Sequence, residues 1–184
     1  MEKVIKALCA AALVAISLSA CQNQTEGEPS ETRQIKPAKI ETFEAPTVGP
    51  DGREMNERLA CLARTIYFEA RGDGEAAMRA VAHVVMNRRD DPFYPDTVCG
   101  VAKQGGEKPP CQFSWWCDGK SDTAQELEAW RDAVMIARQV LAGESNDPTD
   151  GANMFHHVRI NPYWADVAEP THVIGNHQFY RLEQ

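Results

Sequence analysis

Apolar residues recur at helical spacing through the middle of this chain. Within residues 58–71, Leu59, Leu62 and Ile66 follow the i, i+3, i+7 spacing of one buried helix face. Residues 75–89 are apolar on nearly all sides, which favours a helix inside a domain rather than on its surface. The pattern therefore predicts two consecutive helices that bury their apolar faces in one core.

A third helix is predicted over residues 123–142, where apolar side chains keep the same spacing. Thr123 and Glu126 fit a capping box at its start, and Gly143 fits its end. No candidate for chemistry lies on this helix, and we interpret it as scaffold.

Shorter elements fill the rest of the chain. Thr97 is placed to cap a short helix over residues 98–103, and residues 104–120 form an irregular loop. Candidate strands lie at 154–158 and 177–181. Together these patterns predict an α+β domain that is mostly helical, with a few short strands near the C-terminus.

Residues 1–20 have the pattern of a signal peptide, with lysines followed by an apolar run too short to span a bilayer. The run ends in Leu18-Ser19-Ala20-Cys21, which resembles the lipobox of bacterial lipoproteins and implies lipidation of Cys21. Gln22 follows, which in that class implies sorting to the outer membrane. We expect a periplasmic protein held at a membrane by its N-terminal lipid. An ordinary secretory signal with a chance cysteine is the alternative.

Residues 21–54 are polar and rich in proline, so they cannot bury enough apolar surface to fold alone. This composition predicts a flexible lipidated tether ahead of one folded domain at residues 55–184. The formal net charge is -8 and the pI about 5.1. A nucleic-acid partner is not expected, because there is no basic surface to replace counterions. We expect a monomer.

Four cysteines follow the lipidation site, at Cys61, Cys99, Cys111 and Cys117. An even number in an oxidising compartment predicts two disulfides, for which three pairings are open. We favour Cys99–Cys111 with Cys61–Cys117. A four-thiolate zinc site is the alternative, but it requires close pairs such as C-x-x-C, and the sequence has none.

Glu69 lies three residues after Ile66 and so falls on the edge of the buried face of its own helix. Burial disfavours the charged carboxylate, so its pKa should rise from about 4.3 toward roughly 6. A carboxyl that is still protonated near neutral pH can act as a general acid. Gly72 fits a left-handed cap, which would place Glu69 at a helix end. The alternative is a structural salt bridge with Arg71 or Arg88.

The loop between Cys111 and Cys117 contains the candidates Gln112, Phe113, Ser114 and Trp115. Partly exposed aromatic rings suit the C–H faces of sugars, and the amide and hydroxyl groups offer hydrogen bonds. The alternative is an aromatic cluster that fills the core beneath a loop closed by a disulfide. Both can hold if one tryptophan points inward and the other outward.

Five histidines are present, and His83 lies within an apolar helix, where a hydrogen-bonded core residue is expected. His156, His157, His172 and His177 suggest a metal site, yet their spacing matches no zinc pattern, and no H-E-x-x-H occurs. We therefore predict no metal and no cofactor. Hydrogen bonding to sugar or packing in a cleft wall is the expected role.

Several segments, none decisive alone, form an ordered set that covers most of residues 59–181: 62–72, 80–88, 94–101, 111–115, 147–149, 151–152, 162–164 and 174–180. Their order and spacing resemble those of the SleB-type cell-wall hydrolase family. Cys111-Gln112-Phe113-Ser114-Trp115 has the form seen in proteobacterial members. The resemblance implies a small lysozyme-like α+β domain that cleaves peptidoglycan glycan strands. The helix-borne glutamate of the family matches Glu69. His177 and Tyr180 of the last segment are further candidates for substrate binding.

The count of well-placed carboxylates favours one mechanism. Glycosidases that hydrolyse generally need two carboxylates, and only Glu69 has a convincing position, compared with Glu75 or Asp118. One acid suffices for a lytic transglycosylase, which cuts between N-acetylmuramic acid and N-acetylglucosamine and leaves 1,6-anhydromuramyl ends. A hydrolytic muramidase and a catalytically inactive wall-binding lipoprotein are the alternatives.

Spore-cortex members of the family act on a modified muramic lactam and carry a separate wall-binding domain. Residues 21–54 do not have the composition of a second domain, and a lipid anchor is expected instead. The anchor would confine the enzyme beside the wall. We therefore expect ordinary periplasmic peptidoglycan as the substrate.

Overall fold

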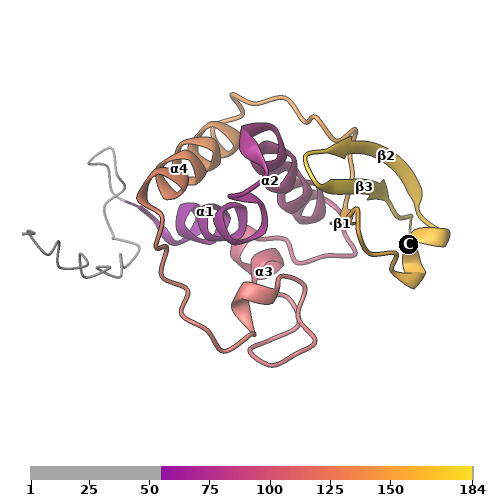
Figure 1. Ribbon diagram of the computed structural model, residues 1–184, viewed down its shortest axis with the longest axis horizontal. Coiled ribbons are helices and arrows are strands. Elements are labelled where there is room, and N and C mark those ends of the chain that lie inside the picture. The colour runs from indigo at the N-terminus through magenta and orange to yellow at the C-terminus, as the bar shows by residue number, and fades with distance from the viewer. Residues whose placement is uncertain (1–54, 184) are drawn as a thin grey trace, which may run out of the picture. The chain divides into compact units, whose positions relative to one another are not determined.

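The computed structural model describes residues 55–183, which form helices packed beside a small sheet (Figure 1). The predicted signal peptide at 1–20, the lipidation site Cys21 and the tether at 21–54 lie outside the described residues. Within the described part, no helix is both long enough and apolar enough to cross a membrane.

Helix α1 (Glu57–Ala70) lies at the centre of the helical part, against α2 (Gly74–Asp90), α3 (Val98–Ala102) and α4 (Leu127–Leu141). Its first turn is capped by Asn56, whose side-chain oxygen accepts the N–H of Leu59 at 2.9 Å. The stripe of Leu59, Leu62 and Ile66 is buried, as the spacing predicts. The predicted cap of α3 is also confirmed, because the side chain of Thr97 accepts the N–H of Gly100.

The connection between α1 and α2 differs from its prediction. Arg71 continues in helical conformation, and the positive φ of 83° occurs at Gly74 rather than at Gly72. The predicted left-handed cap at Gly72 is therefore wrong. The left-handed backbone conformation therefore occurs at the first residue of α2. Just before it, the N–H of Asp73 donates to the carbonyl of Ala70 at 3.0 Å.

The start of α4 also differs, because the helix begins at Leu127 and makes no side-chain cap. The predicted capping box of Thr123 and Glu126 is wrong. The hydroxyl oxygen of Tyr67, on α1, instead accepts the backbone N–H groups of Gln125 and Glu126, each at 3.0 Å. A tertiary contact thus replaces the local one, and the predicted end is confirmed by Gly143, whose φ is 74°.

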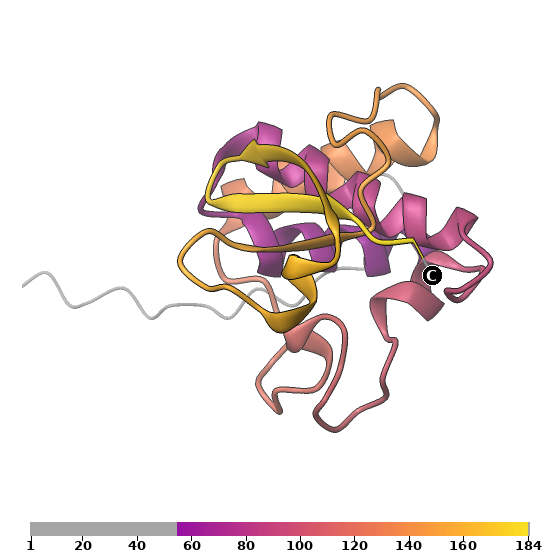
Figure 2. The ribbon, with the colours of Figure 1, turned by 90° about the vertical axis from the view of Figure 1, so that its right-hand side faces the viewer.

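Three antiparallel strands form a sheet in the order β1-β3-β2. Strands β1 (Met154–His157) and β3 (His177–Arg181) match the predicted positions, whereas β2 (Glu169–Ile174) was not predicted. This strand lies at an edge, contains a proline and is mostly exposed, so it lacks the alternation that marks a strand. Figure 2 shows the sheet from its own side of the molecule.

The sheet joins the helices through a second small core, in which Phe179 of β3 is fully buried with Ala80 and Val84 of α2. Short 3-10 turns lie at Ser114–Trp116 and Tyr163–Asp166. The predicted α+β class, mostly helical with short C-terminal strands, is confirmed.

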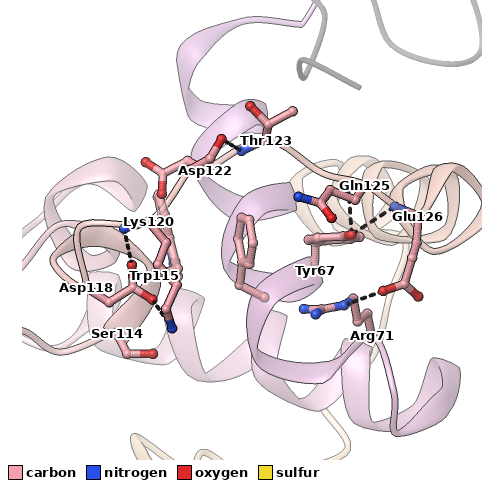
Figure 3. A pocket seen from close by; sticks show the side chains of 12 residues that line it. Tyr67, Arg71, Ser114, Trp115, Asp118, Lys120, Asp122, Thr123, Gln125 and Glu126 are labelled. Carbon is pink, nitrogen blue, oxygen red and sulfur yellow. Dashed lines mark hydrogen bonds and ion pairs between the residues drawn. The ribbon is translucent and has the colours of Figure 1, made fainter. Parts of the chain in front are cut away.

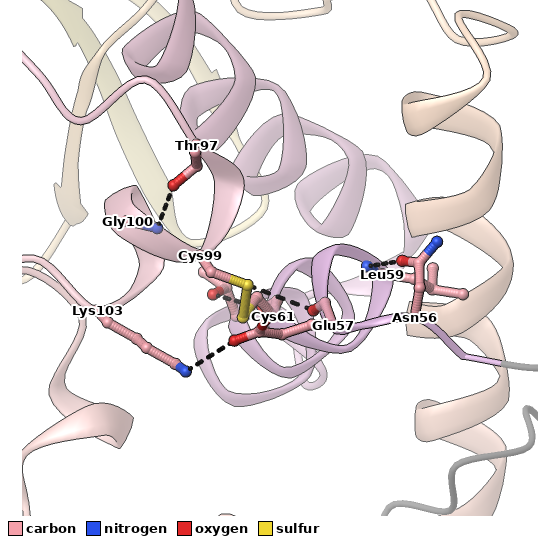
Figure 4. Close-up of a disulfide and its surroundings, with 9 residues drawn as sticks. Asn56, Glu57, Leu59, Cys61, Thr97, Cys99, Gly100 and Lys103 are labelled. Atoms are coloured by element: carbon pink, nitrogen blue, oxygen red, sulfur yellow. Dashed lines mark hydrogen bonds and ion pairs between the residues drawn. A yellow bond between two sulfur atoms is a disulfide. The ribbon is translucent and has the colours of Figure 1, made fainter.

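Two disulfides are present, Cys61–Cys99 and Cys111–Cys117, with Cα atoms 5.3 and 6.2 Å apart. The pairing favoured from the sequence is wrong. The first bridge joins α1 to α3, which pack together (Figure 4), and the second closes the short loop before α4. The four-thiolate zinc alternative is excluded as well, because all four sulfurs are bonded in pairs.

Candidate active site

A cavity of about 370 Å³ lies where the C-terminal turn of α1 meets α2, the disulfide loop and the sheet. Each of these elements contributes to its wall. The lining residues are Glu69, Arg88, Gln112, Met154, Phe155, His156, His157, Ile160, Pro162, Trp164 and His177. We call it the Glu69 cavity.

Glu69 is half-buried in the last turn of α1 and contributes its carboxyl group to this cavity. Burial raises its pKa to about 7, and the nearby charge of Arg88 opposes that rise. The predicted direction is confirmed. Glu69 forms no ion pair with another described residue. Arg71, one of the two partners considered for it, binds Glu126 instead through its Nε at 2.9 Å.

Arg88, on α2, is a buried cation with only 1% of its surface exposed. Its Nε donates to the carbonyl of Asn153 at 2.5 Å, and its guanidinium lies over the rings of Tyr94 and Phe113. With the amide oxygen of Gln112 turned toward it, Arg88 also donates to that oxygen at 3.1 and 3.2 Å. Burial lowers the pKa of Arg88 to about 10, so it stays charged at neutral pH.

His177, on β3, lines the cavity, and its ring contacts the carboxylate of Asp73. Its Nδ1 lies 3.3 Å from a carboxylate oxygen of Asp73, and both side chains are largely buried, at 7% and 13% exposure. The angle of this approach does not suit a hydrogen bond, so we treat it as an electrostatic contact. Burial lowers the pKa of His177, and the charge of Asp73 opposes that shift.

The turn between β2 and β3 fixes this pair. The side-chain amide of Asn176 donates to the other oxygen of Asp73. Gly175 has a φ of 60°, and a Cβ at this position would lie 3.1 Å from the Cβ of Asp73. Only glycine fits this close approach without strain. The hairpin turn therefore packs directly on the connection between α1 and α2.

The remaining histidines divide into two groups. His156 and His157 line the cavity, whereas His172 is exposed on β2. The hydroxyl group of Tyr180 lies 3.0 Å from Nε2 of His156, and the two rings stack. Tyr180 is not among the residues that line the cavity, so it supports a wall residue instead of contacting a ligand there. His83 is buried and pairs with Ser145, as expected for a core histidine.

No metal site emerges from the histidines in the part of the chain that the structure describes. The ligand atoms of Glu57, Cys61 and Cys99 are the one described group of three that lie close together. The two cysteines of this group form a disulfide, so their sulfurs are not free to bind a metal ion.

The disulfide loop divides its candidate residues between different environments. Gln112 lines the Glu69 cavity, but Phe113 is 1% exposed and packs against Phe155, so its ring contacts no ligand. The prediction for Phe113 is corrected in favour of core packing. Ser114 and Trp115 line a second cavity, of about 400 Å³, beside the same end of α1 (Figure 3).

A family model described as Cell Wall Hydrolase matches residues 72–180. The chain belongs to this family. The matched range begins three residues after Glu69 and includes every other residue that lines the Glu69 cavity.

Two curated relatives of this cell wall hydrolase are spore cortex-lytic enzymes. That of Bacillus subtilis (strain 168) is 33% identical over 101 residues, or 55% of this chain and 31% of the relative. That of Oceanobacillus iheyensis (strain DSM 14371) is 39% identical over 105 residues, or 56% of this chain and 33% of the relative. The chain thus matches about a third of the length of these relatives.

A solved structure has a similar fold. It is the catalytic domain of the germination-specific lytic transglycosylase SleB from Bacillus anthracis, with a TM-score of 0.54 and 26% identity. The similarity covers 69% of this chain and 97% of that one. The catalytic domain of the Bacillus cereus SleB protein gives a TM-score of 0.53. These likenesses confirm the lysozyme-like fold of this cell wall hydrolase.

Several residues of this site were not singled out as candidates from the sequence, with Trp164, Ile160 and Asp73 among them. Trp164 and Ile160 come from a segment without periodicity, and Asp73 lies in a connection between helices. Trp164 lies edge-on to both His156 and Tyr180. Arg88 was considered only as a salt-bridge partner, and only the structure shows that it is buried.

Proposed function

We propose that this chain cleaves the glycan strands of peptidoglycan between N-acetylmuramic acid and N-acetylglucosamine, with Glu69 as the general acid. Membership of the cell wall hydrolase family supports the substrate class. The likeness to the SleB catalytic domains supports the type of bond. The position and pKa of Glu69 support its role.

One observation carries the proposed reaction type. Among the described residues that line the Glu69 cavity, Glu69 is the one carboxylic acid. A retaining glycosidase needs a second carboxyl group about 5–5.5 Å away, and an inverting one needs it about 6.5–9.5 Å away. Asp73 lies behind His177, and Asp118 lines the other cavity. A lytic transglycosylase, which uses a single acid, is therefore favoured over a muramidase.

The proposed reaction uses Glu69 twice. Its carboxyl group donates a proton to the glycosidic oxygen while the bond from that oxygen to C1 of the muramic acid breaks. The resulting carboxylate takes a proton from the O6 hydroxyl of the same sugar as O6 bonds to C1. The product is a 1,6-anhydromuramyl end, no water is consumed, and Glu69 returns to its starting state.

A pKa of about 7 suits both halves of this cycle, because a group that serves as acid and then as base works best near the ambient pH. Burial keeps the proton on Glu69 before the reaction. Arg88 then stabilises the carboxylate that proton transfer leaves behind, as its opposing effect on the pKa of Glu69 indicates. Trp164 and Ile160 give the cavity apolar walls for the C–H faces of sugars.

Digestion of purified sacculi, followed by mass spectrometry of the fragments, tests the proposal. We expect fragments that end in 1,6-anhydromuramic acid. Reducing muramic acid ends would indicate a hydrolytic muramidase instead. Absence of any cleavage would indicate the third candidate, a wall-binding lipoprotein without activity.

We also propose that Cys21 anchors the protein by lipid to a membrane facing the periplasm, with the outer membrane favoured by Gln22. The lipobox-like Leu18-Ser19-Ala20-Cys21 supports this location. Cys21→Ala should release the protein from the membrane fraction or leave its signal peptide uncleaved. A variant of mature size that stays with membranes like the wild type would contradict the anchor.

A further inference from the structure

The second cavity, lined by Ser114 and Trp115, takes no part in the reaction described above. It lies beside the C-terminal end of α1, and its walls come from α1, the disulfide loop and the segment that leads into α4 (Figure 3). Phe68, the residue immediately before Glu69, lines it. Two neighbouring residues of one helix thus contribute to two cavities.

Aromatic rings and charged side chains both line this cavity. The ring of Phe68 stacks on the indole of Trp115, with centroids 6.0 Å apart and an interplanar angle of 17°. Arg71 lies over the rings of Tyr67 and Phe68, at 4.9 and 5.9 Å from their centroids. These contacts hold the guanidinium group in a defined position.

Arg71 retains hydrogen-bonding capacity. Its Nε donates to Glu126, but its terminal nitrogens have no acceptor in the part of the chain that the structure describes. Figure 3 shows these nitrogens pointing away from Glu126 and toward the side of the cavity where Ser114 and Trp115 lie. A guanidinium group whose two terminal nitrogens are free suits a carboxylate ligand.

The opposite rim offers a negative group. Asp122 lines the cavity and forms no ion pair with another described residue, whereas the neighbouring Asp118 is paired with Lys120 at 3.3 Å. Burial raises the pKa of Asp122, with a further rise from Asp118 and an opposing effect of Arg64. A cationic ligand group would relieve this unfavourable burial of charge. The cavity therefore suits a ligand that carries both a carboxylate and an ammonium group.

We propose that this second cavity binds the short peptide that peptidoglycan carries on its muramic acid, with Arg71 contacting a peptide carboxylate and Asp122 a peptide ammonium group. This inference rests on the proposed function. The bond that Glu69 would cleave adjoins a muramic acid, and the peptide must leave the glycan near that residue. The peptide contains carboxylates and, where it includes a diamino acid, an ammonium group, which matches the two free groups of the cavity.

Two substrates test the proposal: glycan strands that carry their peptides, and the same strands after an amidase has removed the peptides. We expect the wild-type protein to prefer the peptide-bearing strands. Arg71→Gln should lower kcat/KM on those strands by about tenfold or more, since a charged hydrogen bond is lost. It should leave kcat/KM on the stripped strands unchanged.

Two further variants complete the experiment. Asp122→Asn should show the same selective loss without disturbing the contact between Arg71 and Glu126. Arg79→Gln is the matched control, because Arg79 pairs with Glu75 on α2 and lines neither cavity. It should behave as the wild type on both substrates. Equal losses on both substrates, or no loss with either Arg71→Gln or Asp122→Asn, would overturn the proposal.

Failure of the proposed function remains distinguishable from failure of this inference. If the wild type cleaves neither substrate, the proposed function fails. The affinity of the protein for the free peptide, measured by calorimetry, then tests the peptide site independently of cleavage. Binding that weakens about tenfold in Arg71→Gln supports the peptide site, and absence of binding to the wild type overturns it.

Discussion

Two cavities lie beside the same end of α1, and they differ in how their charges are satisfied. In the Glu69 cavity, a half-buried carboxyl has no ion partner among the described residues, and its pKa is about 7. In the second cavity, Arg71 and Lys120 pair with Glu126 and Asp118 at an exposed rim. In the proposed function the first arrangement keeps a proton ready for transfer, and in the proposed peptide site the second leaves polar groups free for recognition.

The difference follows from helix geometry. Successive residues of a helix point about 100° apart, so Phe68 and Glu69 emerge on different sides of α1. The disulfide loop repeats this division, because Gln112 lines the Glu69 cavity while Ser114 and Trp115 line the other. Proximity in sequence is therefore a poor guide to which residues act together at this site.

The largest expected effect comes from Glu69→Gln. Glutamine keeps the shape but cannot donate the proton, so release of anhydromuropeptides should fall by about 10²–10⁴. The melting temperature should stay the same or rise, because a buried acid is removed. Glu75→Gln, at an exposed acid on the next helix, is the control and should remain active. Near-normal release of anhydro products by Glu69→Gln would refute the assignment.

The pH dependence provides the second test. Glu69 must be protonated to act, so kcat/KM should fall about tenfold per pH unit above a pKa of about 7. Its folded pKa lies above its unfolded one. Its contribution to stability is therefore full at pH values below about 4.5 and is lost as the pH rises through about 7.

Melting temperatures of the wild type and Glu69→Gln, compared at pH 5 and pH 8, check the sign of this linkage. Relative to the variant, the wild type should lose stability between these values. A difference that is constant with pH would show that the carboxyl of Glu69 is not shifted.

Asp73→Asn should have a smaller effect, about a tenfold loss of kcat/KM, because His177 would lose the group that fixes its position. Since Asp73 raises the pKa of His177, the substitution should also lower that pKa, which an NMR titration measures directly. Asp96→Asn, at an exposed acid that lines neither cavity, is the control. An unchanged titration of His177 would argue against the contact.

The two disulfides should differ in what they stabilise. Replacing Cys61 and Cys99 by alanine opens a link across 38 residues, for which chain entropy predicts about 4 kcal/mol. The corresponding figure for Cys111 and Cys117, six residues apart, is about 2 kcal/mol. The second bridge closes the loop that contributes Gln112 to one cavity and Ser114 and Trp115 to the other, so its loss should lower activity more. Urea unfolding and sacculus digestion check this order, and the opposite order in stability would contradict it.

Chelation should have the smallest effect. The proposed acid–base chemistry needs one carboxyl group and no metal ion, so activity after treatment with EDTA should match that of the untreated protein. Loss of activity that zinc or calcium restores would instead assign a metal to the histidines of the Glu69 cavity.

Local pattern predicted a large part of this fold. The phase of Leu59, Leu62 and Ile66 placed Glu69 at the buried edge of its helix, and the structure raises its pKa in the predicted direction. The positions of α2, α3, β1 and β3 were also predicted closely. These features depend on neighbours within one or two helical turns or strand residues, which a single sequence displays.

What the sequence alone determined is therefore the helices, two of three strands and the phase of the candidate acid. Tertiary structure alone decided the disulfide pairing, the cap that Tyr67 supplies to α4, the burial of Phe113 and the contact of Asp73 with His177. Each of these joins groups that lie far apart along the chain or depends on which face of a loop meets the core. Only packing of the whole domain fixes such contacts, because no local propensity distinguishes them from their alternatives.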